Sequence, residues 1–424
     1  MNLFHINGPA VGVLLIALSN LAGADTYGVF DARGLALGGT GVALGDVDTG
    51  HFYNPALTAF HQGHEDRTRD GSHSFHMVLA ALSDGARTAA DAIIDDLEKR
   101  LSTAIDKLND APTPETARAG LSAVRDLNST MHDLDGQNIN ADGYLGYSIS
   151  VPGDREGGAF FVGSRLIGRG ISAISTADFE LLQNYVEELE FVESRGERGK
   201  EHRDLYNDDG GLRNPSSRIQ SSAAGTGLLL SELGVSAAKQ YTLWGQSVAF
   251  GAAPKVVYLR IFDEDWEVVN EKFSRTSDNR TELYFNLDLG AALTVADHWR
   301  VGLAIKDVRS KAITTAAGDH IKLEPRSRLG LAYISESLQV GLDADLNKTS
   351  AWHDVSGRQD ISLGLEYRLS TLALRLGYRH DLGNSVGDQF SAGLGWRVSR
   401  LLMDISYIQG DGGEGGGLRL GWAF

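Results

Sequence analysis

Residues 372–379 read Leu372-Ala373-Leu374-Arg375-Leu376-Gly377-Tyr378-Arg379, with apolar residues alternating with small or charged ones. Successive side chains of a β-strand point to opposite faces, so this pattern predicts a strand with one apolar and one polar face. A face in open water would carry many lysines, threonines and glutamates, but here it carries alanine, arginine and glycine. We therefore expect the polar face to line a confined interior and the apolar face to contact lipid.

The same alternation recurs throughout the last third of the chain, roughly residues 283–424. Segments of about ten alternating residues separated by turns are typical of outer-membrane β-barrels. An open sheet edge in lipid would leave backbone groups unpaired, so the sheet must close. We predict an all-β fold, a transmembrane antiparallel β-barrel of about 14 strands. The predicted strands are residues 72–82, 143–151, 158–168, 221–237, 243–262, 282–295, 299–308, 326–334, 338–347, 360–369, 372–380, 389–398, 401–408 and 416–424.

Composition agrees with an exported barrel. The apolar run 11–18, followed by Ala22-Gly23-Ala24, predicts a signal peptide over residues 1–24, although no Lys or Arg precedes the run. The 424 residues include no cysteine, so strand pairing and barrel closure replace disulfides as the source of stability. The net charge of −17 excludes a nucleic-acid-binding surface, which needs clustered lysine and arginine.

A glycine-rich stretch follows the predicted signal peptide. It runs from Ala32 to Ala43 and is followed by Asn54-Pro55-Ala56. A phosphate-binding loop is disfavoured, because no Lys-Ser/Thr pair follows the glycines and no alternating strand–helix pattern surrounds them.

This stretch, with residues 233–257, 343–347 and 374–379, resembles FadL-like outer-membrane barrels and, more narrowly, the family of the conjugal transfer protein TraF. The resemblance implies an outer-membrane protein in which residues 25–71 fold into the barrel lumen as a hatch and residues 72–424 form the barrel. The hatch residues would then be Gly38, Gly39, Gly41, Asn54, Pro55 and Ala56.

The C-terminal residues and the expected partners also fit an outer-membrane protein. Trp422 and the terminal Phe424 follow an alternating apolar run and resemble the signal read by the barrel-insertion machinery. The expected partners are outer-membrane lipid, lipopolysaccharide, that machinery and components of a transfer or secretion system.

Two stretches change to a helical period. Residues 83–132 read as two amphipathic helices, 83–109 and 115–132, and residues 177–218 read as a helix (177–193) followed by a charged loop. Two roles are open for the first insertion, either covering a barrel mouth or docking a partner.

The predicted inner face carries interleaved charges of both signs. They either pair across a narrow interior, since unpaired buried charges are costly, or line a selective passage. Apolar residues on this face are few, with Tyr284 and the hatch leucines Leu35 and Leu37 as the candidates. The predicted lumen-lining residues are Asp343, Asp345, Glu366, Arg368, Arg375, Arg379, Arg397 and Arg419.

Catalytic and metal sites are not predicted. The Ser, His and Asp residues of the sequence form no ordered catalytic set, and we expect neither an enzyme nor a cofactor. Five histidines lie close together in the sequence, but their spacing does not gather them on one face and no cysteine completes a metal set. They are His51, His61, His64, His73 and His76.

Two functions follow from these observations. One is a transport barrel that passes or gates small molecules, including hydrophobic ones, across the outer membrane. The other is a structural or assembly accessory of a conjugative transfer or secretion system.

Overall fold

The computed structural model describes residues 27–46, 48–60, 71–88, 97–153, 155–197, 202–215, 218–243, 245–269, 272–314, 320–348, 358–383, 387–411 and 413–424. The predicted signal peptide therefore lies outside the described residues, as do His61 and His64.

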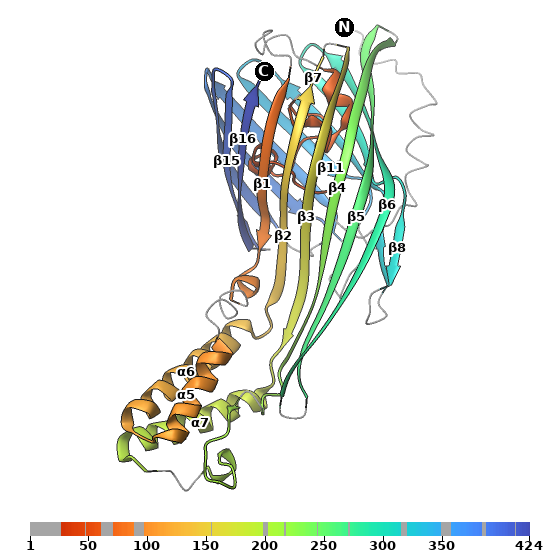
Figure 1. The fold of residues 1–424 in the computed structure, drawn as a ribbon. Helices are drawn as coiled ribbons and strands as arrows, with labels where there is room; N and C mark the ends of the chain where they lie inside the picture. The colour runs from red at the N-terminus through yellow and green to blue at the C-terminus, as the bar shows by residue number, and fades with distance from the viewer. Residues whose placement is uncertain are drawn as a thin grey trace.

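Fourteen antiparallel strands close into one barrel in the order β1-β16-β15-β14-β13-β12-β11-β10-β7-β6-β5-β4-β3-β2 (Figure 1). The first and last strands pair from Ser72↔Ala423 onward, so no strand edge of the barrel is left open. The predicted fold and strand number are confirmed. The strands are β1 (Ser72–Leu82), β2 (Asn138–Val151), β3 (Glu156–Ala173), β4 (Ser222–Leu243), β5 (Gln246–Val269), β6 (Lys272–Ala296), β7 (Trp299–Lys306), β10 (Arg326–Ile334), β11 (Leu338–Asp345), β12 (Asp360–Leu369), β13 (Leu372–Asp381), β14 (Gln389–Val398), β15 (Leu401–Gly410) and β16 (Gly413–Ala423).

The strands have unequal lengths, and β2 to β6 are all longer than the alternation predicted. Strands β4 and β5 pair without interruption of register as far as Leu243↔Gln246, so the predicted turn at 238–242 is wrong. The real turn contains Gly245, whose φ of 78° suits glycine. Strands β5 and β6 likewise pair out to Val269↔Lys272, where we predicted a loop. Backbone pairing continues there although the apolar alternation has stopped.

Short and long connections lie at opposite ends of the barrel. Residues 297–298, 335–337, 370–371 and 399–400 make the short turns, at the end where the C-terminus lies (Figure 1). The long connections lie at the other end. One of them contains a separate two-stranded sheet, β8 (Lys311–Thr314) with β9 (His320–Leu323), which the sequence analysis did not predict.

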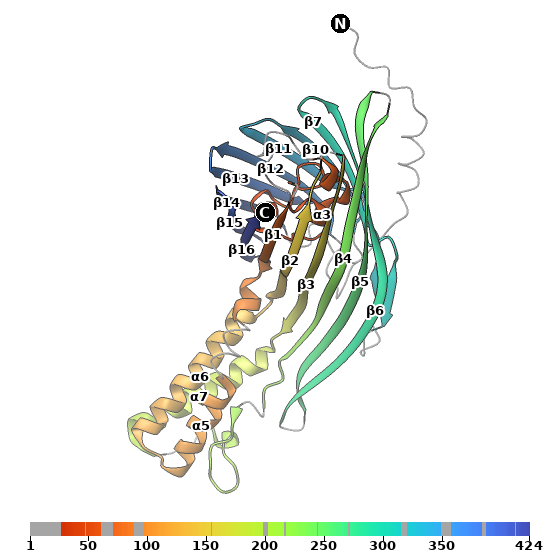
Figure 2. The ribbon, with the colours of Figure 1, turned by 45° about the horizontal axis from the view of Figure 1, so that its top comes forward.

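Residues 27–46 and 48–60, hereafter the hatch segment, lie inside the barrel (Figures 1 and 2). The segment contains helix α2 (Ala32–Ala36), helix α3 (Gly50–Tyr53) and the 3-10 helix η1 (Pro55–Ala59). Asp31 caps α2 by accepting a hydrogen bond from the Gly34 N–H, and the Tyr53 hydroxyl donates to the same carboxylate at 2.7 Å.

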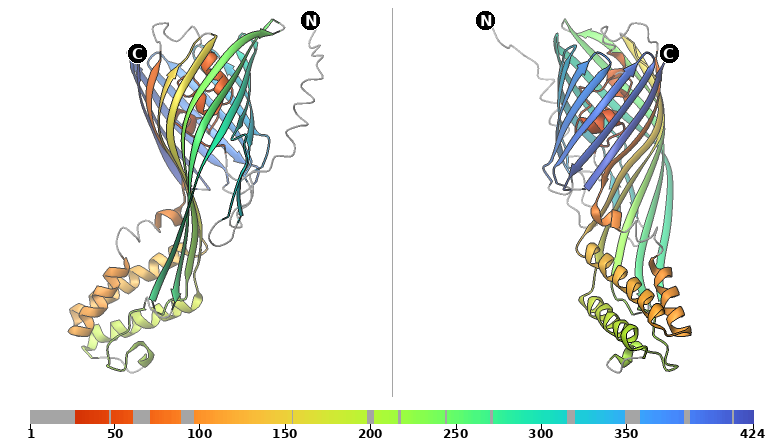
Figure 3. Two further views of the ribbon diagram at one scale, coloured as in Figure 1. Left: turned by 45° about the vertical axis from the view of Figure 1, so that its right-hand side comes forward. Right: turned by 90° about the vertical axis from the view of Figure 1, so that its left-hand side faces the viewer.

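Helices α5 (Leu97–Asp110), α6 (Pro114–Leu134) and α7 (Thr176–Arg195) form a bundle beyond the strand ends (Figure 3). Thr113 makes a capping box at the start of α6, Ser175 caps α7, and Gly196 ends α7 in the left-handed conformation. The predicted helix 83–109 lies partly outside the described residues. In the part of the chain that is described, no helix has both the length and the apolar character to cross a bilayer.

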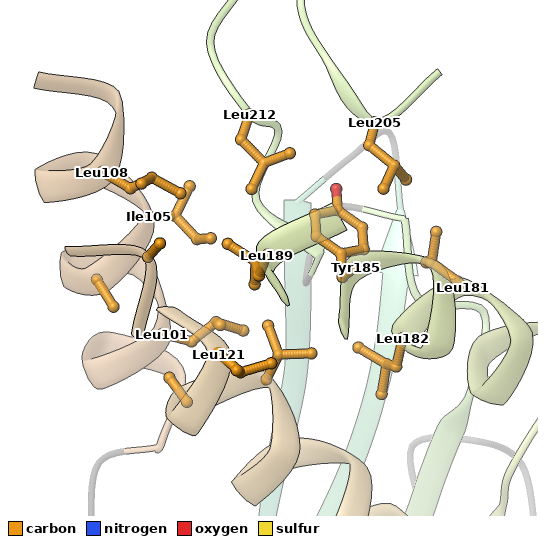
Figure 4. Close-up of a cluster of buried hydrophobic side chains, with 14 of the residues drawn as sticks. Leu101, Ile105, Leu108, Leu121, Leu181, Leu182, Tyr185, Leu189, Leu205 and Leu212 are labelled. Carbon is orange, nitrogen blue, oxygen red and sulfur yellow. The ribbon is translucent and has the colours of Figure 1, made fainter. Parts of the chain in front are cut away.

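The bundle has a hydrophobic core separate from the barrel. Leucines from all three helices point toward one another, together with Leu205 of η2 (Arg203–Leu205) and Leu212 from the loop after α7 (Figure 4). Tyr185 also lies in this core, where burial raises its pKa to about 12 and its hydroxyl donates to the Arg213 carbonyl at 2.9 Å. The two inserted stretches therefore fold as one unit at the long-connection end.

Removing side-chain volume from this core tests its independence. We expect Leu189→Ala, which truncates a side chain that is 0% exposed, to destabilise the bundle by about 2–5 kcal/mol. Thermal melting followed by circular dichroism measures the loss, and the gel mobility of unheated samples reports whether the barrel stays closed. The matched control is Phe191→Ala in the same helix, because Phe191 is 42% exposed. Equal effects of the two substitutions would contradict the assignment of this core.

Candidate functional site

The inner face of the barrel carries the charges and contacts the hatch segment. Asp343, Glu366, Arg375, Arg379 and Arg419 are each at most 7% exposed. Two further predicted residues, Arg368 and Arg397, lie near the short turns, and their side chains are 23% and 32% exposed. The last of the eight predicted lumen-lining residues, Asp345, accepts a hydrogen bond from Arg328 Nε at 2.6 Å.

Six of the buried charges form a closed ring in which the sign alternates. Arg375 bridges two carboxylates of the wall, with Nε 2.6 Å from Glu366 Oε2 and Nη1 2.7 Å from Asp404 Oδ1. Arg419 Nη1 lies 3.3 Å from both Asp404 Oδ2 and Asp46 Oδ2. Arg33 Nε closes the ring, at 3.9 Å from Asp46 Oδ2 and 2.8 Å from Glu366 Oε2.

This charge ring joins two parts of the chain. Arg33 and Asp46 belong to the hatch segment, whereas the other four members belong to strands β12, β13, β15 and β16. Removing one partner of a buried ion pair costs about 3–5 kcal/mol, because the remaining charge is left without compensation. Withdrawing the hatch segment would remove two members of the ring at once, so the ring holds the segment in the lumen.

Other inward side chains bind the backbone of the hatch segment directly. Arg379 Nε donates to the Gly38 carbonyl at 2.9 Å, and Arg328 Nη1 donates to the Gly39 carbonyl at 3.2 Å. Asp343 Oδ2 accepts from the N–H groups of Gly41 and Val42 at 2.8 and 3.0 Å. These bonds satisfy polar backbone groups that would otherwise be buried without partners.

Glycine permits the close approach that these bonds need. Gly38 and Gly39 have φ angles of 67° and 89°, which other residues rarely adopt. On the wall, a Cβ at Gly377 would overlap the backbone nitrogen of Gly38, and one at Gly302 would overlap the carbonyl of Val42. The glycines on the inner face therefore make room for the hatch backbone.

The Asn54-Pro55-Ala56 stretch ends the hatch segment against the opposite wall. The Asn54 amide nitrogen donates to the carbonyls of Val42 and Ala291 at 2.8 and 3.0 Å, and its oxygen accepts from the Ala56 N–H at 3.0 Å. Pro55 occupies the first turn of η1, where its missing N–H costs nothing. Asn54 thus links two parts of the hatch segment to β6.

The wall formed by β3–β6 also carries an apolar inner surface. Ile167, Leu228 and Tyr284 belong to it, together with Val257, Leu259 and Ile261 on successive inward positions of β5. The expectation that the inner face has few apolar residues beyond Tyr284 is therefore wrong. The outward positions Val256 and Tyr258 of β5 are apolar as well, so alternation of polarity could not separate the two faces there.

A family model described as "F plasmid transfer operon, TraF, protein" matches residues 51–345. The chain belongs to this family. No curated protein matches the chain.

Solved barrels similar to this TraF-family chain include the toluene transporter TbuX of Ralstonia pickettii. It shares 12% identity over 96% of this chain and 99% of that chain, with a TM-score of 0.50. The toluene transporter TodX of Pseudomonas putida shares 12% identity over 95% and 98%, with a TM-score of 0.45. A FadL homologue of Pseudomonas aeruginosa shares 12% identity over 95% and 99%, with a TM-score of 0.44. The match to TbuX shows the fold of outer-membrane barrels.

Three members of the charge ring, Arg33, Asp46 and Asp404, are absent from the eight predicted lumen-lining residues of this TraF-family chain. Asp404 lies in the predicted strand 401–408, and Arg33 and Asp46 lie in residues 25–71, which were predicted to enter the lumen. Charged residues in a buried segment require partners of opposite sign, so the signal was present in that prediction.

The histidines of this TraF-family barrel do not gather into a metal site in the described residues, where no group of three metal-ligating side chains occurs. His73 is half-buried, with Nδ1 2.6 Å from the Tyr147 hydroxyl, whereas His51 and His76 are buried. Trp422 and Phe424 are 50% and 39% exposed on the outer face. Their role as an insertion signal stays a prediction.

Neutralising one member of the ring tests whether it holds the hatch segment. We expect Glu366→Gln to weaken docking by about 3–5 kcal/mol, because Arg33, Arg368 and Arg375 all bond to this carboxylate. Single-channel recording in planar bilayers should then show open events that are rare or absent in the unchanged protein.

The control for this measurement is Glu180→Gln on the exposed face of α7. In addition, the double variant Arg33→Gln/Glu366→Gln should lose less docking free energy than the two single variants together. Each single change leaves one buried charge without its partner, and the double change removes both charges. Additive effects, or an unchanged recording for Glu366→Gln, would contradict the ring's role.

Proposed function

We propose that this TraF-family barrel lies in the outer membrane and passes small apolar molecules through its lumen, with the hatch segment as the gate. Short turns of such barrels face the periplasm and long connections face outward. The apolar inner surface of β3–β6 would then lie toward the outside, and the hatch segment toward the periplasm. The observation that carries the proposal is this apolar surface, because an interior that served only structural pairing would not need it.

The β8–β9 hairpin covers the apolar inner surface. Ile313 of β8 and Leu323 of β9 pack in the same cluster as Val257 and Leu259. Lys311 Nζ adds an ion pair to Glu282 of β6 at 3.0 Å. Outward movement of the hairpin would expose this surface to an incoming molecule.

The route continues to the hatch segment. A small cavity lies where the apolar surface meets it, lined by Leu230 and Tyr144 of the wall and by Phe30 of the segment. Its volume of about 20 Å³ holds one water molecule, so a larger solute requires movement of the segment. Charged residues complete the lining, namely Arg165, Glu232 and Arg326.

A polar substitution at one position of the apolar inner surface tests whether solutes pass along it. TbuX is described as a toluene transporter, so toluene is the probe of choice. We expect Leu259→Asn to lower the uptake of radiolabelled toluene by Gram-negative cells that carry the chain. If the bound toluene is destabilised by about 1–2 kcal/mol, its occupancy of the surface, and with it uptake at low toluene concentration, falls roughly 5- to 30-fold.

The matched control is Leu259→Met, which conserves apolar character and volume and should keep uptake close to that of the unchanged chain. Uptake by Leu259→Asn equal to that of the control would refute the route along β5. If cells with the unchanged protein take up no more toluene than cells without the chain, transport of toluene is refuted.

A second candidate, an accessory of a transfer or secretion system, is favoured by the helical bundle. The bundle has its own core and stands beyond the strand ends, where a partner could reach it (Figure 2). Replacing residues 97–134 by a short linker should abolish co-purification of envelope components while leaving toluene uptake intact. The opposite result, with co-purification kept and uptake lost, would assign the bundle to transport.

A further inference from the structure

Two histidines are buried where the hatch segment meets the barrel wall. His51 of α3 is 2% exposed and His76 of β1 is 0% exposed. The ring of Phe52 contacts both, with centroid distances of 4.1 Å to His51 and 5.2 Å to His76. In the described residues, neither ring nitrogen of His51 has a hydrogen-bond partner, and Nδ1 of His76 has none. Nε2 of His76 lies 3.0 Å from Ser148 Oγ.

Cations face these imidazoles. Lys306 of β7 donates to the Phe52 carbonyl at 2.8 Å, next to His51, and Arg419 of β16 faces both rings. The Asp46 carboxylate also faces them, but it already accepts a hydrogen bond from the Thr49 N–H at 2.8 Å and pairs with Arg419 in the charge ring. Strands β2 and β3 place the neutral side chains of Tyr144 and Phe161 against Phe52, and Ser148 of β2 lies against His76.

Protonation of either imidazole is therefore unfavourable while the hatch segment is docked. An imidazolium has two N–H donors. Both would lack an acceptor in His51, and the Nδ1–H would lack one in His76. Lys306 and Arg419 would repel a charged His51, and Arg419 would repel a charged His76. Burial lowers the pKa of His51 to about 3, whereas a solvated histidine has a pKa of about 6.5. A histidine whose pKa is lower in the docked state stabilises docking fully above about pH 6.5, and this contribution is lost as the pH falls below that value.

We propose that His51 and His76 make the docking of the hatch segment pH-dependent, so that acidification loosens the segment from β1 and opens the lumen. The segment supplies one imidazole and the wall supplies the other, so their separation gives both access to water and lets both take up protons. At pH 5 the docking equilibrium falls by roughly 30-fold for each histidine that becomes protonated on release. The inference concerns docking alone and holds whichever solute passes through the barrel.

Amide hydrogen exchange of the full chain in lipid nanodiscs tests this proposal. The measured quantity is the exchange rate of hatch amides 38–44 divided by that of β13 amides in the same sample, which cancels the intrinsic effect of pH on exchange. We expect this ratio to rise at least about tenfold between pH 7.5 and pH 5.0 in the unchanged protein. A ratio that stays constant would overturn the proposal, whatever the outcome of the toluene assay.

Variants assign the response to the two histidines. His51→Gln combined with His76→Gln should remove the pH dependence, because glutamine does not titrate. The control His380→Gln changes an exposed histidine, 2.7 Å from Asp388, and should respond like the unchanged protein. If the double variant fails to close into a barrel, the single variants replace it and each should lose part of the response. A variant response equal to that of the unchanged protein would also overturn the proposal.

Discussion

The ring of alternating charges is the interaction on which the rest of this structure depends. Its arginines are Arg33, Arg375 and Arg419, and its carboxylates are Asp46, Glu366 and Asp404. A charge buried without a partner is far more costly than a paired one, and the hatch segment gives Glu366 and Arg419 of the wall partners in addition to those within the wall. The segment in turn cannot bury Arg33 and Asp46 without the wall. Barrel and hatch segment therefore stabilise each other as one folded unit.

Glycine makes this mutual burial sterically feasible. The hatch backbone comes so close to the wall that inward positions such as Gly302 and Gly377 leave no room for a side chain. Long arginine side chains reach across the remaining gaps to carbonyl groups of Gly38 and Gly39. The glycines on the inner face thus leave space for the hatch backbone, and the charged side chains form hydrogen bonds with its polar groups.

The two sides of the barrel differ in character. Strands β12–β16 supply four of the six ring charges, whereas β3–β6 extend farther, carry the apolar inner surface and lead toward the helical bundle (Figure 1). A hatch segment anchored on the charged side and bordered by apolar surface on the other can move without dismantling the barrel. The proposed gate, the β8–β9 hairpin that covers the apolar surface and the pair of buried histidines all depend on this asymmetry.

The sequence by itself determined the barrel, its fourteen strands and its inward charges, because a strand in lipid imposes a period of two that any reader of residues 372–379 can follow. Only the tertiary structure decided which charges meet. The ring joins Arg33 to Glu366 across 333 positions of sequence, and alternation assigns a residue to a face but not to a partner. The same limit hid the apolar surface on β5, where both faces carry apolar residues, and the contact between His51 and the wall at β1. Pairing depends on distances in space, and those are set by closure of the sheet around the segment it encloses.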